Sequence, residues 1–187
     1  PGSISKRDIL LNLPTQKIRL GEDGELTCPM LVLRSTDRVA LTGPNGSGKS
    51  TLLRRLIPDL NAPPEHITYV PQEIGANECR KLLCEVQRLP RERLGHLMII
   101  VSRLGSRPDR LLESAEPSPG ETRKLLLALG MTREPHIVIM DEPTNHMDLP
   151  SIECLEEALA DCPCGLLLVS HDRLFLDKLT GTEWRIS

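Results

Sequence analysis

The eight residues from Gly43 to Ser50, GPNGSGKS, constrain the fold more than any other part of this sequence. They fit the pattern G-x-x-x-x-G-K-[ST], in which a Gly-rich loop connects a strand to a helix. Residues 38–42 predict the strand, and residues 49–57 predict a helix that ends at Pro58. The N–H groups of such a loop and the amino end of the helix bind phosphate groups. A Gly-rich turn that matches by chance is the alternative, and the flanking strand and helix disfavour it.

The motif gives separate roles to Lys49 and Ser50. Lys49 supplies a positive charge for the β- and γ-phosphates of a nucleotide, and Ser50 supplies a hydroxyl ligand for Mg²⁺. The residues that we expect to contact a bound nucleotide in this segment are Gly43, Pro44, Asn45, Gly46, Ser47, Gly48, Lys49, Ser50 and Thr51.

A pair of carboxylates follows the apolar run at residues 137–140, which predicts a buried parallel strand. Asp141 and Glu142 therefore come at the carboxyl end of a strand, where ligands bind in open α/β sheets. We expect Asp141 to hold Mg²⁺ through water and Glu142 to polarise the attacking water as a general base. The alternative is that both residues only begin a loop, which the phosphate-loop motif in the same chain disfavours.

A weaker signal is the string Ser118-Pro119-Gly120-Glu121, just before a strongly helical stretch at residues 121–131. A hydroxyl, a glycine and the amino end of a helix can bind an anion. Ser-Pro-Gly is also a common turn, so the string carries little weight by itself.

Predicted strands alternate with predicted helices along the chain, which indicates an α/β domain with a mostly parallel central sheet. Strands at residues 26–33 and 38–42, around a turn at 35–37, predict an antiparallel part near the N-terminus. Two consecutive helices at residues 78–87 and 91–104 predict a small helical subdomain, roughly residues 76–118, inserted into a single domain of residues 4–187. The other predicted strands are 66–70, 137–140, 165–169 and an edge strand at 183–186; the other helices are 151–160, with Ser151 as N-cap, and 172–179.

The charge of the 187-residue chain is unevenly distributed, although its net value is only −3. Residues 80–110 contain eight Lys or Arg against three acids, whereas residues 134–172 contain no Lys or Arg. The basic stretch either contacts RNA phosphates or is a solvated helix face. The low net charge gives no overall positive field that would attract nucleic acid.

Six cysteines are present, and none of their spacings matches a zinc site. We expect free thiols in a reducing cytoplasm, with metal or redox use of Cys162-Pro-Cys164 as the alternative. No apolar run approaches the roughly 18 residues needed to span a membrane, and no signal peptide is visible, so we expect no membrane insertion. The opening Pro1-Gly2-Ser3 is typical of a cloning scar.

Taken together, these motifs resemble those of the ABC ATPase superfamily. The phosphate loop corresponds to its Walker A motif, residues 137–142 to Walker B, and Ser118–Glu121 to the signature motif, with SPGE in place of SGGQ. Gln72 resembles the Q-loop glutamine, Asp148 the D-loop aspartate and His171 the switch histidine. The strings DEPTNHMDL at 141–149 and SHDR at 170–173 look most like the ABC-F class of two-domain proteins, which act on the ribosome.

The resemblance implies a P-loop NTPase fold, with ATP and Mg²⁺ as cofactors and a second ABC domain as partner. It makes Glu142, His171 and Gln72 catalytic, adds Gln72 to the Mg²⁺ ligands Ser50 and Asp141, and adds Ser118, Gly120, Glu121 and Asp148 to the nucleotide-binding residues. ATP would lie between the Walker A motif of one domain and the signature of another, as an ATP-driven clamp. The chain would be the C-terminal ABC domain and a weak ATPase alone, with the ribosome or RNA as a further partner.

Two alternatives to this function remain open: the ATPase subunit of a membrane transporter and a non-hydrolysing ATP-binding clamp. The chain also departs from the family at the adenine site, because no aromatic residue precedes Tyr69. Adenine contact must therefore be aliphatic or cationic, or come from the partner domain.

Overall fold

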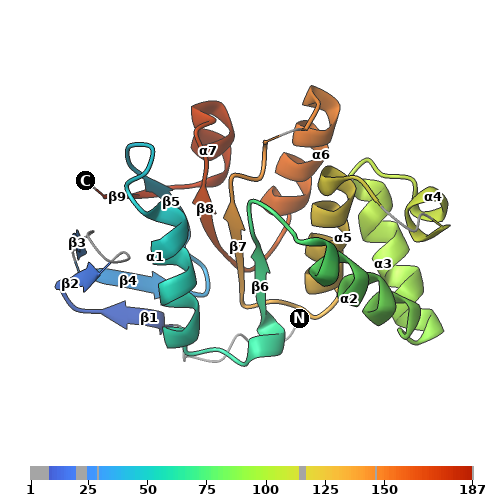
Figure 1. Cartoon of the computed structure of the whole chain (residues 1–187), viewed down its shortest axis with the longest axis horizontal. Helices are drawn as coiled ribbons and strands as arrows, with labels where there is room; N and C mark the ends of the chain where they lie inside the picture. Colours follow the sequence, from blue (N-terminus) through green and yellow to red (C-terminus); the bar gives the residue numbers. More distant parts are fainter. Residues whose placement is uncertain (1–8, 20–24, 29, 114–116, 146, 187) are drawn as a thin grey trace.

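The structure, a computed structural model, describes residues 9–19, 25–28, 30–113, 117–145 and 147–186. The expected cloning scar and the start of the predicted domain lie outside these residues. Figure 1 shows a central sheet with a helix and short strands on one side and a larger group of helices on the other.

The central sheet has five parallel strands in the order β6-β7-β8-β5-β9. The α/β architecture with a mostly parallel sheet is therefore confirmed. The predicted edge strand near the C-terminus is also confirmed, since β9 lies at the end of the sheet beside β5. The strands are β5 (Arg38–Thr42), β6 (Ile67–Val70), β7 (Ile137–Asp141), β8 (Gly165–Val169) and β9 (Thr182–Arg185).

The antiparallel part near the N-terminus is present, but as two separate strand pairs. β1 (Ile9–Leu13) pairs with β4 (Leu31–Arg34), and β2 (Gln16–Arg19) pairs with β3 (Glu25–Cys28). The prediction of one strand over residues 26–33 was wrong, and β1 and β2 were not predicted. The sequence places Pro29 in the middle of that run, and a proline has no N–H group to continue a strand ladder.

All of the predicted helices are present, although several of them begin or end at slightly different residues. α4 was not predicted, so three helices, α2 to α4, follow one another after β6. The helices are α1 (Lys49–Leu56), α2 (Ala76–Gln87), α3 (Arg91–Arg103), α4 (Pro108–Glu113), α5 (Pro119–Met131), α6 (Leu149–Ala160) and α7 (Arg173–Leu179), with 3₁₀ turns η1 (Ile57–Asp59) and η2 (Pro64–His66).

The N-cap of α6 differs from the prediction. Asp148, not Ser151, is the capping residue, because its carboxylate accepts the backbone N–H of Ser151 at 3.1 Å. The helix therefore begins at Leu149, with Pro150 in its first turn, where a proline costs nothing because the N–H would be free anyway.

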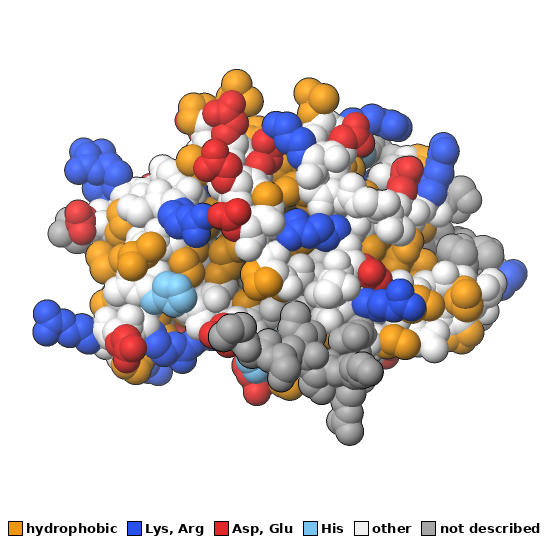
Figure 2. All heavy atoms as spheres, turned by 180° about the vertical axis from the view of Figure 1, so that it is seen from behind, with side chains coloured by type: hydrophobic (Ala, Val, Ile, Leu, Met, Phe, Trp, Pro, Cys, Tyr) orange, Lys and Arg blue, Asp and Glu red, His pale blue; other side chains and the backbone are white. Residues whose placement is uncertain are grey.

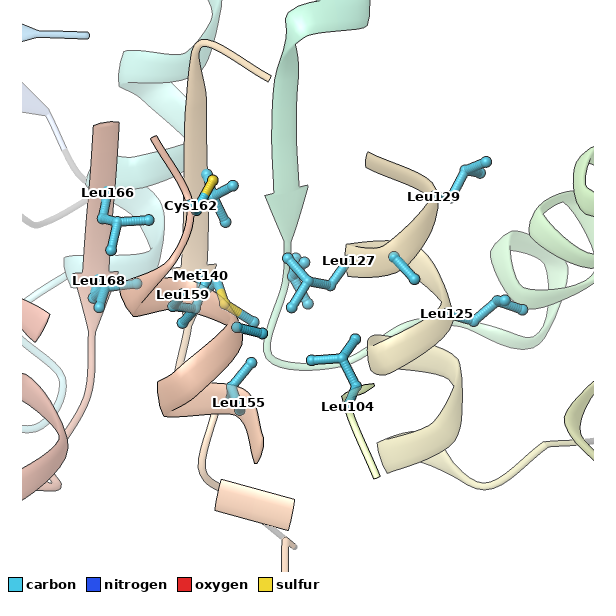
Figure 3. Close-up of a cluster of buried hydrophobic side chains, with 14 of the residues drawn as sticks. Leu104, Leu125, Leu127, Leu129, Met140, Leu155, Leu159, Cys162, Leu166 and Leu168 are labelled. Atoms are coloured by element: carbon cyan, nitrogen blue, oxygen red, sulfur yellow. The ribbon is translucent and has the colours of Figure 1, made fainter. Parts of the chain in front are cut away.

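Both faces of the sheet are covered, because the alternate side chains of each buried strand enter different cores. In β7, Val138 and Met140 pack with α5 and α6, whereas Ile137 and Ile139 pack with α1 and the β1–β4 pair. Figure 3 shows the first of these cores, where Leu159 of α6 lies beside Met140 and Leu168. Leu127 of α5 points toward the strands, whereas Leu125 and Leu129 point away from them on the other side of this helix. Both cores are almost entirely aliphatic.

Helix α5 approaches β6 unusually closely at Gly130. A Cβ atom added there would lie 2.2 Å from Oγ1 of Thr68, a separation that van der Waals contact forbids. The glycine therefore lets the helix that follows Ser118 lie directly on the strand that leads to Gln72.

The segment between α6 and β8 is held by hydrogen bonds from Arg38 of β5 and by a disulfide. The guanidinium of Arg38 donates to the carbonyl oxygens of Leu159, Ala160 and Cys162, which satisfies the carboxyl end of α6. The expectation of free thiols was wrong for Cys162 and Cys164, which the structure joins in a disulfide. Their backbones are close enough for this because only one residue separates them, at a Cα–Cα distance of 5.4 Å.

Within the described residues, no helix is both long and apolar enough to cross a membrane.

Candidate nucleotide-binding site

The loop between β5 and α1 contains a lysine whose side chain folds back over it. Nζ of Lys49 donates to the carbonyl oxygens of Gly43 at 3.0 Å and Pro44 at 2.9 Å, and the side chain is buried. The ammonium group is therefore held at the loop by two neutral acceptors. A phosphate oxygen would be a stronger partner for it, because hydrogen bonds between charged groups are roughly twice as strong as neutral ones.

Two glycines of the loop have backbone conformations that other residues adopt at a cost. Gly46 has φ 76° and Gly48 has φ 86°, both in the left-handed region. Gly48 is also the N-cap of α1, and it places the first free N–H groups of the helix at the loop. The local sequence thus shapes a concave loop with N–H donors and one ammonium group.

A cavity of about 470 Å³, which we call the Lys49 cavity, lies against this loop at the carboxyl end of the sheet. It brings together most of the residues predicted for phosphate, metal and catalysis. Its lining includes Asn45, Gly46, Gly48, Lys49, Ser50, Thr51, Gln72, Asp141, Glu142 and His171, and also Asn145 and Val169. Gly43 and Pro44 line a neighbouring cavity of about 460 Å³ that shares Lys49 and His171.

Asp141 is the residue whose environment points most clearly to a cation. Its carboxylate is 1% exposed, and among the described residues neither oxygen has a hydrogen-bond partner. A buried carboxylate without partners is costly. Mg²⁺ prefers oxygen ligands, and the hydroxyl of Ser50 and the amide of Gln72 line the same cavity. The donor set therefore fits Mg²⁺, with phosphate and water completing its shell.

Glu142 follows Asp141 and is held in an unusual conformation. Its φ is 50°, in the left-handed region that side chains other than glycine seldom adopt. Its backbone N–H donates to the carbonyl oxygen of Val169 at 2.8 Å. Its carboxylate contacts His171 twice, at Nε2 and at the backbone N–H. The strained backbone thus turns this carboxylate into the cavity beside the switch-histidine position.

The electrostatics of Glu142 combine opposing effects. Burial raises the pKa of its carboxyl group, and the charge of Asp141 adds to this rise. His171 and Lys49 act in the opposite direction and lower that pKa. Because burial is the largest of these effects, Glu142 takes up a proton more readily than an exposed glutamate does.

The predicted signature and D-loop residues lie elsewhere. Ser118, Gly120, Glu121 and Asp148 line a separate cavity of about 500 Å³. Ser118 caps α5: its Oγ accepts the N–H of Glu121, and the Glu121 carboxylate accepts the N–H of Ser118. Pro119 stands at the first helical position, which proline favours. The departure from the usual signature at this position therefore suits the start of a helix.

Sequence reasoning missed Arg123, which is buried in α5. Its guanidinium donates to the carbonyl oxygens of Gln72, Glu142 and Asn145. The only signal in the sequence was a pair of cations, Arg123-Lys124, inside an otherwise apolar helical run. A pair of charges in such a run does not reveal its partners, because these belong to loops far away in the sequence.

A parallel sheet with this loop and with a buried aspartate and an adjacent glutamate at its carboxyl end defines a P-loop nucleotide-binding domain. The family described as "ABC transporter" matches residues 29–145, more than half of the chain. The chain belongs to this family, whose ATPase domains bind and hydrolyse ATP.

Relatives narrow the class further. The "Ribosome protection protein VmlR" of Bacillus subtilis is 37% identical over 162 residues, covering 81% of this chain and 29% of that protein. The "ATP-binding protein Uup" of Escherichia coli is 34% identical over 173 residues, covering 82% and 26%. The "ABC transporter F family member 2" of Arabidopsis thaliana is 32% identical over 165 residues, covering 81% and 24%. The chain is thus an ABC-F-like nucleotide-binding domain, and it spans less than a third of each of these proteins.

Solved structures show the same fold. The ATP-binding subunit of an ABC transporter superposes with a TM-score of 0.75 at 22% identity, over 95% of this chain and 85% of that one. The archaeal ribosome recycling factor aABCE1, in complex with a ribosomal stalk protein, gives 0.70 at 19% identity, over 99% and 38%.

Proposed function

We propose that this domain holds Mg-ATP in the Lys49 cavity and hydrolyses it when a second ABC domain supplies the opposite side of the nucleotide. The observation that carries the proposal is the pair Asp141 and Glu142. The first is a buried carboxylate without a hydrogen-bond partner in the described part of the chain, and the second is turned into the same cavity by a left-handed backbone. These two environments suit different tasks, one for a metal and one for a proton.

The residues divide the work as follows. Lys49 exchanges the carbonyl oxygens of its own loop for phosphate oxygens, and the loop N–H groups bind the remaining phosphates. Ser50, Asp141 and Gln72 hold Mg²⁺, which neutralises charge on the phosphate oxygens when it is bound. Glu142 accepts the proton of the attacking water, and His171 orients the Glu142 carboxylate through its two contacts.

Pairing is supported by the separation of the two cavities. A nucleotide in the Lys49 cavity does not meet Ser118, Gly120, Glu121 or Asp148, which line the other cavity of the same chain. A second domain would bring its own copies of these residues to the nucleotide. Leu149 is the first residue of α6 and is 67% exposed, and Leu174 lies in the first turn of α7 and is 75% exposed. Both helices begin after the carboxyl ends of their preceding strands, β7 and β8, where such a partner would dock. Burying them would stabilise the closed pair.

We further propose that the whole protein acts on the ribosome. The support is the resemblance to VmlR, whose name describes ribosome protection, and the basic stretch on α2 and α3. Arg88, Arg91 and Arg93 are exposed there. Figure 2 shows Lys and Arg side chains at separate places on the rear face, interleaved with Asp and Glu. Such a distribution favours RNA binding through a few local phosphate contacts, rather than through one large basic surface.

Two parts of the proposal concern the chain itself: that residues 4–187 form one domain with a helical insertion at about 76–118, and that it is the C-terminal domain of a pair.

The test of hydrolysis by a pair of domains is steady-state ATP turnover of the full-length protein and of this domain alone, at equal site concentration. We expect turnover in the full-length protein and much slower turnover in the single domain. Binding of Mg-ATP without turnover in the full-length protein would favour the non-hydrolysing clamp instead.

A further inference from the structure

A single guanidinium group donates to three carbonyl oxygens on two separate loops behind the nucleotide cavity. Arg123 is 4% exposed and lies on α5, five residues after Ser118. Its Nη1 donates to the carbonyl oxygens of Glu142 at 3.3 Å and Asn145 at 3.1 Å, and its Nη2 donates to the carbonyl oxygen of Gln72. Its partners therefore follow β6 and β7, two neighbouring strands of the sheet.

All three acceptor residues line the Lys49 cavity, whereas Arg123 does not. The guanidinium therefore cannot touch a bound nucleotide there, and it acts on the backbone of residues that can. We propose that Arg123 is a positioning residue: it fixes Gln72, Glu142 and Asn145 relative to one another and connects them to the helix that begins at Ser118.

The backbone of Glu142 explains why such support is needed. Its left-handed conformation, φ 50°, persists only where the surroundings hold it. Three hydrogen bonds do so. Its N–H donates to the carbonyl oxygen of Val169 of β8, and its carbonyl oxygen accepts from the N–H of Asn145 and from Nη1 of Arg123, each at 3.3 Å. Without the Arg123 bond, only the long contact with Asn145 holds the Glu142 carbonyl oxygen, so the peptide after Glu142 and the carboxylate are less firmly fixed.

An arginine suits this task better than any other side chain. A guanidinium presents five N–H donors in one rigid plane, so it can reach carbonyl oxygens in different directions. Burial lowers the pKa of Arg123, while Asp141, Glu73 and Glu142 act in the opposite direction. These acids help to keep the group charged inside the protein.

The same helix connects the two cavities. Ser118 and Glu121 line one cavity at the start of α5, and Arg123 holds the lining of the other. Five residues of helix span only about 7.5 Å along the axis. This step rests on the proposed pairing: if a partner's nucleotide moves the Ser118 end, the loops that contain Gln72 and Glu142 move as well.

The kinetic test uses the full-length protein with Arg123→Met, which keeps the aliphatic volume but has no donors. We expect kcat to fall on the order of 10²-fold, because the base and the Gln72 loop lose their alignment. KM for Mg-ATP should change little, because the Lys49 loop is untouched. Arg123→Lys, with one ammonium group for three acceptors, should recover part of the kcat. The control is Leu129→Ala, a buried residue of the same helix that lines neither cavity; it should lower stability yet keep kcat near wild type.

Amide hydrogen exchange without nucleotide separates this inference from the proposed function. We expect Arg123→Met, but not Leu129→Ala, to lose protection around residues 72, 142 and 145. If that pattern is seen while the wild-type protein has no turnover, the positioning role stands and the proposed function fails. Wild-type kcat and wild-type protection in Arg123→Met would overturn the positioning role, as would an equal loss of kcat in Leu129→Ala.

Discussion

The carboxylate of Glu142 is held by His171 at both of its oxygens. Oε1 lies 3.1 Å from Nε2 of the imidazole, and Oε2 accepts the backbone N–H of the same residue at 3.2 Å. The carboxylate is 8% exposed, whereas the imidazole is 56% exposed. A buried carboxylate is thus oriented by a residue that solvent or a partner can reach. If Glu142 is the proposed base, this contact is a point at which turnover can be controlled.

Replacing Glu142 by Gln tests whether it is the base. Gln has the same shape but cannot take a proton, and loss of a general base costs about 10²–10⁴-fold in rate. Binding of Mg-ATP should survive, because Lys49, Ser50 and Asp141 are unchanged. Phosphate release and ribosome co-sedimentation of the full-length protein, with and without ATP, measure both effects. We expect lost turnover with ATP-dependent retention on ribosomes.

Two other results would change the interpretation of this variant. Near-normal turnover in Glu142→Gln would show that another group is the base. Lost turnover without ribosome retention would agree with the proposed ATPase activity but would disfavour the ribosomal role.

Lys49→Ala should remove most of the affinity for Mg-ATP. Hydrogen bonds to charged groups contribute about 1.5–3 kcal/mol each, so the dissociation constant should rise at least about tenfold. Calorimetric titration measures this directly. Lys178→Ala is the matched control, because that exposed lysine is ion-paired with Glu156 away from the cavity. Equal affinity of Lys49→Ala and wild type would show that the nucleotide binds elsewhere.

The raised pKa of Glu142 predicts a pH-dependent stability. Because burial raises the pKa in the folded state above its value in the unfolded chain, the folded state takes up the proton first as pH falls. The contribution of Glu142 to stability is therefore greatest at low pH and is lost as pH rises through the raised pKa. Urea unfolding of wild type and Glu142→Gln at several pH values isolates this effect, since Gln does not titrate. The free energy of unfolding of wild type minus that of the variant should increase on acidification, and a difference that is flat with pH contradicts the shift.

The basic stretch predicts a salt-dependent interaction with the ribosome. The side chains of Arg88, Arg91, Arg93 and Arg107 are exposed and make no hydrogen bond or ion pair with the residues that the structure describes. Arg103 differs, because it is ion-paired with Asp161 at 2.6 Å, so it is left unchanged. If the four arginines bind RNA phosphates, neutralising all of them should reduce the slope of log affinity against log salt by about 1 for each arginine–phosphate pair that is removed.

Ribosome binding of the full-length protein at several salt concentrations provides this measurement. Arg55→Ala is the control, because Arg55 is exposed but paired with Asp59 on another part of the surface. A slope identical to wild type in the fourfold variant would mean that the stretch is a solvated helix face.

Gly130→Ala should destabilise the domain by about 1–3 kcal/mol, as overpacking of a dense core does. The added methyl group would overlap Thr68 of β6, so α5 or the strand must move. Gly95→Ala in α3 is the matched control: nothing lies within 4 Å of the added atom, and alanine favours a helix. Thermal unfolding should therefore shift down for the first variant and slightly up for the second.

Much of the site could be predicted from sequence because its signals are local. The Gly-rich loop, the strand before it and the helix after it are consecutive, so spacing alone identifies them. Asp141 and Glu142 likewise follow a run that only a buried strand explains. Fold class followed from the alternation of such runs, and the order of the motifs identified the family.

Other features could not be predicted, because they depend on residues far apart in the sequence. The partners of Arg123 lie 51, 19 and 22 residues away, and nothing in the helical run indicates them. The contact of Gly130 with Thr68 depends on the distance between a helix and a strand. The strand pairs β1–β4 and β2–β3 were missed because short strands are stabilised by their partners more than by their own residues.

The sequence by itself thus determined which chemical groups this domain possesses and on which kind of element each one stands, because backbone propensities and hydrophobic periodicity act over a few residues. Only the tertiary structure decided which groups meet. It turned Glu142 toward His171 through a left-handed backbone and left Asp141 without a hydrogen-bond partner among the residues that the structure describes. It also placed Ser118 in a different cavity from Lys49 and put one buried guanidinium behind two loops. The physical reason is that packing a helix onto a sheet fixes distances between segments that the chain itself leaves free.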